Sequence, residues 1–150
     1  NNFMNMKIIN GFNISAEELC KRKKVYWIQG PSGIGKSKLA YDIIKFCNKK
    51  NNNEHESLSA IFGKGYQIQI FEKSNIVLFD NFMKGCCTPK TLINLVQNKR
   101  PLKAKFGRKF SNFNIIMICS CYRINEIFPT VKKERRKMWE DYIEVIDFYN

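Results

Sequence analysis

The chain has 150 residues, 44% of them apolar, which suits one domain with a sizeable hydrophobic core. It carries 26 Lys and Arg against 13 Asp and Glu, and the net charge of +13 favours a polyanionic partner such as nucleic acid, although a solvated basic surface shaped by codon use is the alternative. No apolar run approaches the roughly 18 residues of a membrane helix, and the six Cys and one His show neither a disulfide framework nor a zinc spacing. We therefore expect reduced thiols and an intracellular location.

The first 24 residues predict little regular structure. Residues 1–13 are polar and predict a loose segment. Ser15 followed by Glu18 is a capping-box pattern, which predicts a short helix that ends in the basic run at residues 21–24. We therefore divide the chain into a loose N-terminal segment with a short helix, residues 1–24, and one domain, residues 25–150.

A strand, a loop and a helix are predicted in succession from residue 25. Residues 25–29 form an apolar, aromatic and β-branched run that is typical of a buried strand. Residues 30–37 fit the pattern G-x-x-x-x-G-K-[ST] of a phosphate-binding loop. Apolar residues then recur at helical spacing, at Leu39, Ile43 and Phe46 with Cys47 beside it.

This loop has the chemistry to hold ATP with Mg²⁺. Its glycines let backbone N–H groups approach phosphate oxygens, and the helix N-terminus adds partial positive charge. Lys36 would reach the β- and γ-phosphates, and the Ser37 hydroxyl would ligate Mg²⁺. A Gly-rich turn before an ordinary helix is the alternative. The candidate nucleotide-binding residues are Gly30, Pro31, Ser32, Gly33, Ile34, Gly35, Lys36, Ser37 and Lys38.

Loops and apolar strands are predicted further along the chain. Residues 48–53 have no periodicity and predict a surface loop, and the glycines in residues 63–65 predict a turn. Residues 66–71 predict a short strand. Residues 75–80 and 114–120 are apolar runs that predict buried strands.

A helix and a basic hairpin are predicted between the last two strands. Thr88 and Pro89 begin the helix, with Pro at its first position. Residues 101–110 are basic and contain Gly107, which favours a hairpin. Buried strands that alternate with helices predict an α/β domain with a central, mostly parallel sheet flanked by helices.

Asp80 is a candidate metal ligand. It closes an apolar strand 44 residues after Lys36, where an acid could hold Mg²⁺ through water beside a phosphate-binding loop. The alternative is an ordinary turn residue. The upstream loop favours the metal role.

The order of these elements resembles the superfamily 3 helicase domain, a P-loop ATPase related to the AAA+ class. The nearest resemblance is to the ATPase half of circovirus-like replication initiator proteins, followed by the related RNA-virus helicases. The similarity covers residues 24–148. It includes the loop at residues 27–40 and an apolar strand with an acidic end at residues 76–82. Residues 105–107, Lys-Phe-Gly, stand in place of the family's Lys-Gly-Gly hairpin tip, and residues 115–121 stand in place of a strand that ends in Thr-Ser-Asn.

The resemblance implies an ATP-driven motor that assembles into a homo-oligomeric ring of the hexamer class and moves along single-stranded DNA or RNA. Such a protein would act in the cytoplasm or nucleus of a host cell. In the family the hairpin tip contacts the nucleic-acid backbone, and a solvated basic loop is the alternative. The residues that would make these contacts here are Lys103, Lys105, Phe106, Arg108 and Lys109.

The departures from the family pattern fall on groups that accelerate hydrolysis. Asn81 stands in place of a second acid, and an amide is no base at neutral pH. Cys121 stands in place of the sensor Asn, with the polar Ser120 beside it. The family's arginine pair near the C-terminus aligns with acids, while Arg135 and Arg136 lie one helical turn earlier and are the candidates for the arginine that a neighbouring subunit would receive.

Three functions therefore remain open at this stage. The first is a helicase-type ATPase domain of a viral or virus-derived replication protein, with either active or attenuated hydrolysis. The second is an ATP-gated nucleic-acid-binding or assembly module without useful turnover. The third, a small P-loop kinase, is disfavoured because we identify neither an Arg-rich lid nor an acceptor pocket.

Overall fold

We describe a computed structural model of the chain that covers residues 7–21, 25–50, 56–62, 68–69, 74–97, 102–103, 109–110 and 115–149. The helices in these ranges are α1 (Ala16–Cys20), α2 (Lys36–Lys50), α3 (Pro89–Gln97), α4 (Ile124–Ile127) and α5 (Lys133–Glu140). The strands are β1 (Lys7–Asn10), β2 (Val25–Gln29), β3 (Glu56–Phe62), β4 (Ile68–Gln69), β5 (Ser74–Phe79), β6 (Leu102–Lys103), β7 (Lys109–Phe110), β8 (Ile115–Ser120) and β9 (Ile143–Asp147).

One sheet organises the described part of the chain, with the strand order β1-β9-β2-β8-β5-β3-β4. Each neighbouring pair from β1 to β3 is parallel, and only the short β4 runs antiparallel to its neighbour. The predicted α/β class with a mostly parallel sheet is therefore confirmed.

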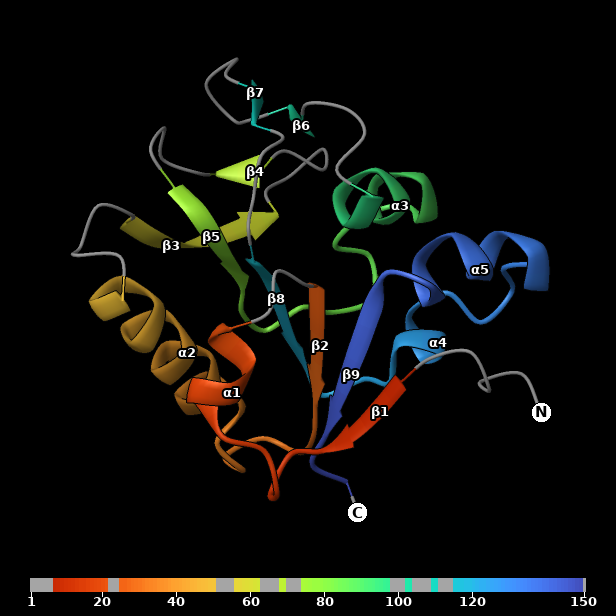
Figure 1. Cartoon of the computed structure of the whole chain (residues 1–150). Coiled ribbons are helices and arrows are strands. Elements are labelled where there is room, and N and C mark those ends of the chain that lie inside the picture. The colour runs from red at the N-terminus through yellow and green to blue at the C-terminus, as the bar shows by residue number, and fades with distance from the viewer. Residues whose placement is uncertain are drawn as a thin grey trace.

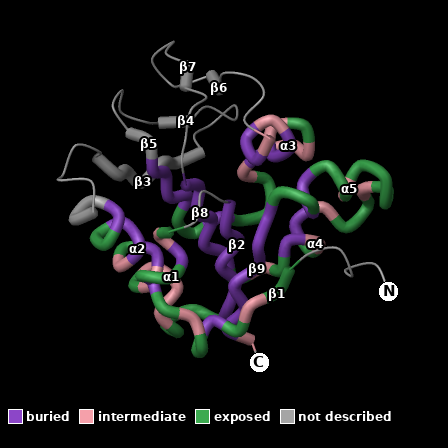
Figure 2. The backbone as a smooth tube through the Cα atoms, in the orientation of Figure 1, coloured by how far each residue is buried: buried purple, intermediate pink, exposed green. Residues whose placement is uncertain are grey.

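Helices cover both faces of the sheet (Figure 1). On one face α1 and α2 pack over a cluster that includes Tyr26, Ile28 and Ile43. On the other, α3, α4 and α5 pack over a cluster that includes Trp27 and Leu92. Successive residues of β2 thus point to opposite faces, and both faces are buried (Figure 2), which explains why the central strands read as continuous apolar runs.

The sheet order determines where the predicted site residues lie. Strand β2, which precedes the predicted phosphate-binding loop, lies between β9 and β8, and β8 lies between β2 and β5. Because these strands are parallel, their carboxyl ends share one edge of the sheet. The segments that follow Gln29, Phe79, Ser120 and Asp147 therefore meet at that edge.

Several sequence predictions match the observed elements. The strands at residues 25–29, 75–80 and 114–120 are confirmed as β2, β5 and β8, within a residue at their ends. The short helix is confirmed as α1, where the Ser15 Oγ accepts a hydrogen bond from the Glu18 N–H at 3.2 Å.

Other predictions were wrong or incomplete. Residues 1–13 are not wholly loose, because residues 7–10 form β1 and pair with β9. The Lys7 Nζ also lies 3.8 Å from Glu144 Oε1 of β9. Residues 48–50 belong to α2 rather than to a loop, and β3 at residues 56–62 was not anticipated. The predicted turn at residues 63–65 lies outside the described residues.

Strands β6 and β7 are short and antiparallel, with Lys103 opposite Lys109. Residues 104–108, which join them, lie outside the described residues. The assignment of this segment as a basic nucleic-acid-binding hairpin therefore stays a prediction.

Candidate functional site

Residues 30–35 connect β2 to α2 in the strand–loop–helix order expected of a phosphate-binding loop. Gly33 and Gly35 adopt φ values of 78° and 111°, which side-chain-bearing residues rarely adopt. The Leu39 N–H donates to the Gly35 carbonyl at 3.0 Å and so closes the first turn of α2. The glycines at these two positions are therefore required by the backbone path of the loop.

Lys36, the first residue of α2, folds back over this loop. Its Nζ donates to the Gly30 carbonyl at 2.6 Å and to the Pro31 carbonyl at 2.9 Å. The ammonium group is thus held above the start of the loop, where phosphate oxygens could replace either carbonyl as acceptors.

Ser37 and Asp80 lie in direct contact, although 43 positions separate them in the sequence. The Ser37 hydroxyl lies 2.9 Å from Asp80 Oδ1 and 3.0 Å from Oδ2. Ser37 is the second residue of α2, Asp80 follows β5, and Asp80 is exposed. The fold therefore brings together the two side chains that the sequence marked as Mg²⁺ ligands.

This pair fits Mg²⁺ bound together with a nucleotide. Mg²⁺ is commonly held by one or two protein oxygens while phosphates and water complete its octahedral shell. In the described ranges no group of three or more His, Cys, Asp or Glu side chains could hold a metal ion without such help. A hydroxyl and a carboxylate in contact beside a phosphate-binding loop suit the assisted arrangement.

Asn81 forms a tight turn immediately after Asp80, the candidate metal ligand. It has a φ of 55°, a left-handed conformation that Asn and Asp tolerate better than other side-chain-bearing residues. Its N–H donates to Asp80 Oδ1 at 3.0 Å, and the following Phe82 N–H donates to the Cys119 carbonyl at 2.8 Å. Asn81 thus orients the Asp80 carboxylate through its backbone.

Ser120 was a candidate for a sensor role, but its hydroxyl serves the fold. The side chain is 1% exposed, and its Oγ donates to the Phe82 carbonyl at 2.7 Å while accepting from the Tyr122 N–H at 3.0 Å. A hydroxyl with both backbone partners in place is poorly suited to bind a phosphate or a water molecule. Its carbonyl does reach the loop, because it accepts from the Gly30 N–H at 3.2 Å.

Cys121 is exposed at the carboxyl end of β8, the strand between β2, which leads into residues 30–35, and β5, which leads into Asp80. Its carbonyl accepts a hydrogen bond from the Tyr149 hydroxyl. The Arg123 guanidinium lies 4.4 Å from the centroid of the Tyr149 ring. Cys121 therefore follows the strand that lies between β2 and β5, and its assignment to a sensor position stays a prediction.

Cys119 is a neighbour of the loop that sequence reasoning did not single out. It is buried, and its Sγ donates to the Lys36 carbonyl at 3.7 Å. Burial, aided by the Asp80 carboxylate, raises the pKa of Cys119 to about 12, and the nearby Lys36 charge offsets this only in part. The thiol is therefore neutral at physiological pH and acts as packing behind the helix start.

Phe148 is a second residue that the prediction missed. Its backbone N–H donates to the Gln29 carbonyl at 2.8 Å, which extends the β9 pairing to the base of the loop. A Cβ on Gly30 would lie 2.7 Å from the Phe148 Cβ, so only glycine fits there without movement. Phe148 follows β9, a strand that the residue patterns did not mark, so no local sequence signal indicated its packing against Gly30.

Arg135 and Arg136 lie apart from the loop. Both are on α5, which leads into the amino end of β9, whereas the loop is at the carboxyl edge of the sheet. In Figure 1, α5 lies at the right, beyond β9, and the β2–α2 connection lies at the bottom. The structure therefore does not bring these arginines to the phosphate-binding loop of the same chain.

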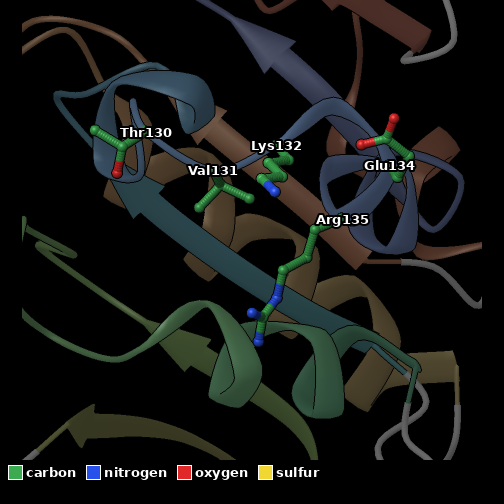
Figure 3. A pocket seen from close by; sticks show the side chains of 5 residues that line it. All are labelled: Thr130, Val131, Lys132, Glu134 and Arg135. Atoms are coloured by element: carbon green, nitrogen blue, oxygen red, sulfur yellow. The ribbon is translucent and has the colours of Figure 1, made fainter.

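The two arginines also differ from each other. Arg136 is half-buried, its Nε finds no hydrogen-bond partner within the described ranges, and its charge acts on Glu140. Burial raises the pKa of Glu140, and the Arg136 guanidinium partly offsets that rise. Arg135 is exposed and extends away from α5 along a pocket of about 460 Å³ (Figure 3). That pocket is lined by Thr130, Val131, Lys132, Glu134 and Arg135.

The predicted nucleic-acid contacts are only partly placed. Lys103 and Lys109 lie on paired strands, while Lys105, Phe106 and Arg108 lie outside the described residues. Within the described ranges, none of the helices has the length and apolar character needed to cross a membrane.

Comparison with protein-family models and with curated proteins found no match to this sequence. The functional assignment therefore depends on the chemistry and geometry of the site.

Proposed function

We propose that this chain is an ATP-binding domain of the superfamily 3 helicase type, from a viral or virus-derived replication protein. In this proposal ATP binding and slow hydrolysis are coupled to movement along single-stranded DNA or RNA and to duplex unwinding. The observation that carries the proposal is the contact of the Ser37 hydroxyl with both oxygens of Asp80, beside a loop of the form G-x-x-x-x-G-K-[ST].

Each residue of the loop would have a distinct task in binding. The backbone N–H groups of residues 33–38 would surround the phosphates, and Lys36 would exchange its carbonyl acceptors for phosphate oxygens. Ser37 and Asp80 would hold Mg²⁺, which supplies charge neutralisation at the β- and γ-phosphates.

The same geometry predicts slow turnover. Asn81 can orient a water molecule but cannot accept its proton at neutral pH, and Ser120 is committed to two backbone groups. Loss of a general base costs on the order of 10²–10⁴-fold in rate. The chemical step of ATP hydrolysis, rather than ATP binding, should therefore limit the rate of turnover.

An arginine from a neighbouring subunit fits this arrangement. Because α5 lies apart from the phosphate-binding loop of its own chain, Arg135 on α5 could reach only a nucleotide that is bound to a second copy of the chain. This supports a homo-oligomeric ring, with the +13 net charge providing attraction for the nucleic acid.

A second candidate function is an ATP-gated nucleic-acid-binding or assembly module without useful hydrolysis. The Ser120 hydroxyl favours this second function, because it is buried and hydrogen-bonded to the backbone, and the neighbouring Cys121 supplies no amide that could act as a sensor in its place. Both candidates share the binding site and differ only in turnover.

Steady-state ATP hydrolysis measured with and without single-stranded DNA or RNA tests the proposal. We expect a low basal rate that rises when nucleic acid is added and that is lost in the Lys36→Ala variant. ATP binding with no turnover under any condition would favour the second candidate. Turnover that Lys36→Ala does not change would mean that another site or a contaminant is responsible.

A further inference from the structure

The orientation of a bound nucleotide follows from the position of its metal site. Ser37 and Asp80 mark the β- and γ-phosphate end, which lies on the β8 and β5 side of the phosphate-binding loop. Strand β2 has β9 as its other neighbour, and β1 lies beyond β9. A triphosphate that passes through the loop from the metal site therefore leads its nucleoside towards the ends of β9 and β1.

Two phenylalanines and two glycines meet at this place. Phe148 follows β9 and Phe12 follows β1, and their rings pack edge to face with centroids 5.1 Å apart. A Cβ on Gly11 would lie 2.7 Å from the Phe148 ring, and one on Gly30 would lie 2.7 Å from the Phe148 Cβ. Phe148 is thus held between the turn after β1 and the first glycine of the loop.

Phe12 is the exposed member of this group. Phe148 is 8% exposed and belongs to the core, whereas Phe12 is 58% exposed although it is aromatic. Ile34, at the tip of the loop, is 36% exposed, and its Cγ2 lies 3.1 Å from the position of a Cβ on Gly30. An apolar surface of Phe12 and Ile34 therefore continues from the loop across Phe148.

Three hydrogen bonds hold the turn that carries Phe12. The Phe12 N–H donates to Asn10 Oδ1 at 2.9 Å, and the Gly11 N–H donates to the Asp147 carbonyl at 2.7 Å. The Asn13 N–H donates to the Asn10 carbonyl at 3.1 Å. A ring on such a turn loses little conformational entropy when a ligand packs against it.

We propose that Phe12 stacks on the nucleobase, with Ile34 and Phe148 completing an apolar base-binding surface, an inference that rests on the proposed nucleotide-binding function. Every base has a π-face, so this surface favours a nucleoside triphosphate over inorganic triphosphate without requiring one particular base. It also gives β1 a functional role beyond extending the sheet.

The test compares the binding of Mg-ATP and Mg-tripolyphosphate by calorimetry. The variants are Phe12→Ala, Phe12→Leu, which keeps an apolar cover over Phe148, and the control Ile8→Ala, which removes a 55% exposed side chain from β1. We expect both Phe12 variants to weaken Mg-ATP about tenfold and to leave Mg-tripolyphosphate unchanged. Ile8→Ala should bind both probes like the wild type.

Three results would overturn the inference, and only one of them would also overturn the proposed function. Unchanged ATP affinity in Phe12→Ala and Phe12→Leu removes the stacking role and leaves the proposed function intact. Equal loss of both probes in Phe12→Leu means that Phe12 supports the loop and does not contact the base. Failure of the wild type to bind either probe overturns the proposed function together with this inference.

Discussion

Two neighbouring strand ends at the sheet edge next to the loop use their polar side chains differently. At the end of β5, Asp80 faces Ser37 of α2, and Asp80 is accessible to solvent. At the end of β8, the hydroxyl of Ser120 is buried between the Phe82 carbonyl and the Tyr122 N–H. The first pair is available to a ligand and the second group is part of the fold.

This difference separates binding from catalysis. A site that binds Mg-nucleotide needs the loop, the ammonium group and two oxygen ligands, and all of these lie together. A site that hydrolyses it quickly also needs a base and a sensor beside the γ-phosphate, and in the proposed function these positions carry Asn81 and Cys121. Variants at the two strand ends should therefore affect different measurements.

The largest expected effect is on ATP affinity when the ammonium group is removed. Lys36→Ala should weaken Mg-ATP binding by at least about a hundredfold, because charge-assisted hydrogen bonds to phosphate are lost in a site that depends on them. Calorimetry measures this effect. Lys45→Ala, an exposed lysine of the same helix, is the matched control and should bind normally.

Equal ATP affinity in Lys36→Ala and the wild type would show that the loop is a structural turn.

The next effect concerns the stability of the loop base. Gly30→Ala should lower the free energy of unfolding by about 2–3 kcal/mol, because its Cβ would meet the Phe148 Cβ at 2.7 Å and Ile34 Cγ2 at 3.1 Å. In Gly33→Ala the new Cβ has no atom within 4 Å, so only the strain of a φ of 78° should lower the free energy of unfolding, by about 1 kcal/mol. Urea unfolding without nucleotide measures both.

The order of these two variants is the decisive feature. If Gly33→Ala destabilised the protein more than Gly30→Ala, Phe148 would not be packed against the loop as described.

A smaller loss of stability is expected on the β8 side. Ser120→Ala removes a donor to the Phe82 carbonyl and the acceptor of the Tyr122 N–H, which should cost about 1–2 kcal/mol. ATP affinity at a temperature where the variant is folded should remain near that of the wild type. The exposed Ser32→Ala, in the loop itself, is the stability control.

A Ser120→Ala variant with wild-type stability and much weaker ATP binding would place its hydroxyl in the binding site after all.

The central strands and the loop could be predicted from the sequence because their signals are local. Residues 25–29, 75–80 and 114–120 are buried on both faces and so are continuous apolar runs. The loop pattern then predicted the roles of Lys36 and Ser37, and the position of Asp80 at the end of an apolar strand predicted that it lies near them. Only the distance between Ser37 and Asp80 had to come from the fold.

The remainder depends on contacts between distant segments. Strand β1 is polar at Lys7 and Asn10 and exists through its pairing with β9, more than 130 positions away. The role of Ser120 depends on a carbonyl 38 positions earlier, and the left-handed turn at Asn81 depends on where β5 stops. No local pattern encodes these partners.

The smallest expected effect is a gain of rate. Asn81→Asp should raise ATP turnover about threefold to tenfold, since a carboxylate can accept a proton from water and tolerates the φ of 55°. The other altered groups would still limit the rate. Asn81→Gly, which also accepts this φ but supplies no base, is the control and should show no gain in steady-state hydrolysis.

Unchanged turnover in Asn81→Asp with ATP affinity intact would mean that residue 81 does not face the attacking water.

The central claim is that Ser37 and Asp80 share one Mg²⁺ with the nucleotide. The most direct measurement is ATP affinity by calorimetry, with Mg²⁺ and with chelator, for the wild type, Ser37→Ala, Asp80→Asn and the double variant. We predict that Mg²⁺ strengthens ATP binding in the wild type, that either substitution removes most of this gain, and that the double variant loses no more than the single variants. A wild-type affinity independent of Mg²⁺, or losses that add fully in the double variant, would contradict the account.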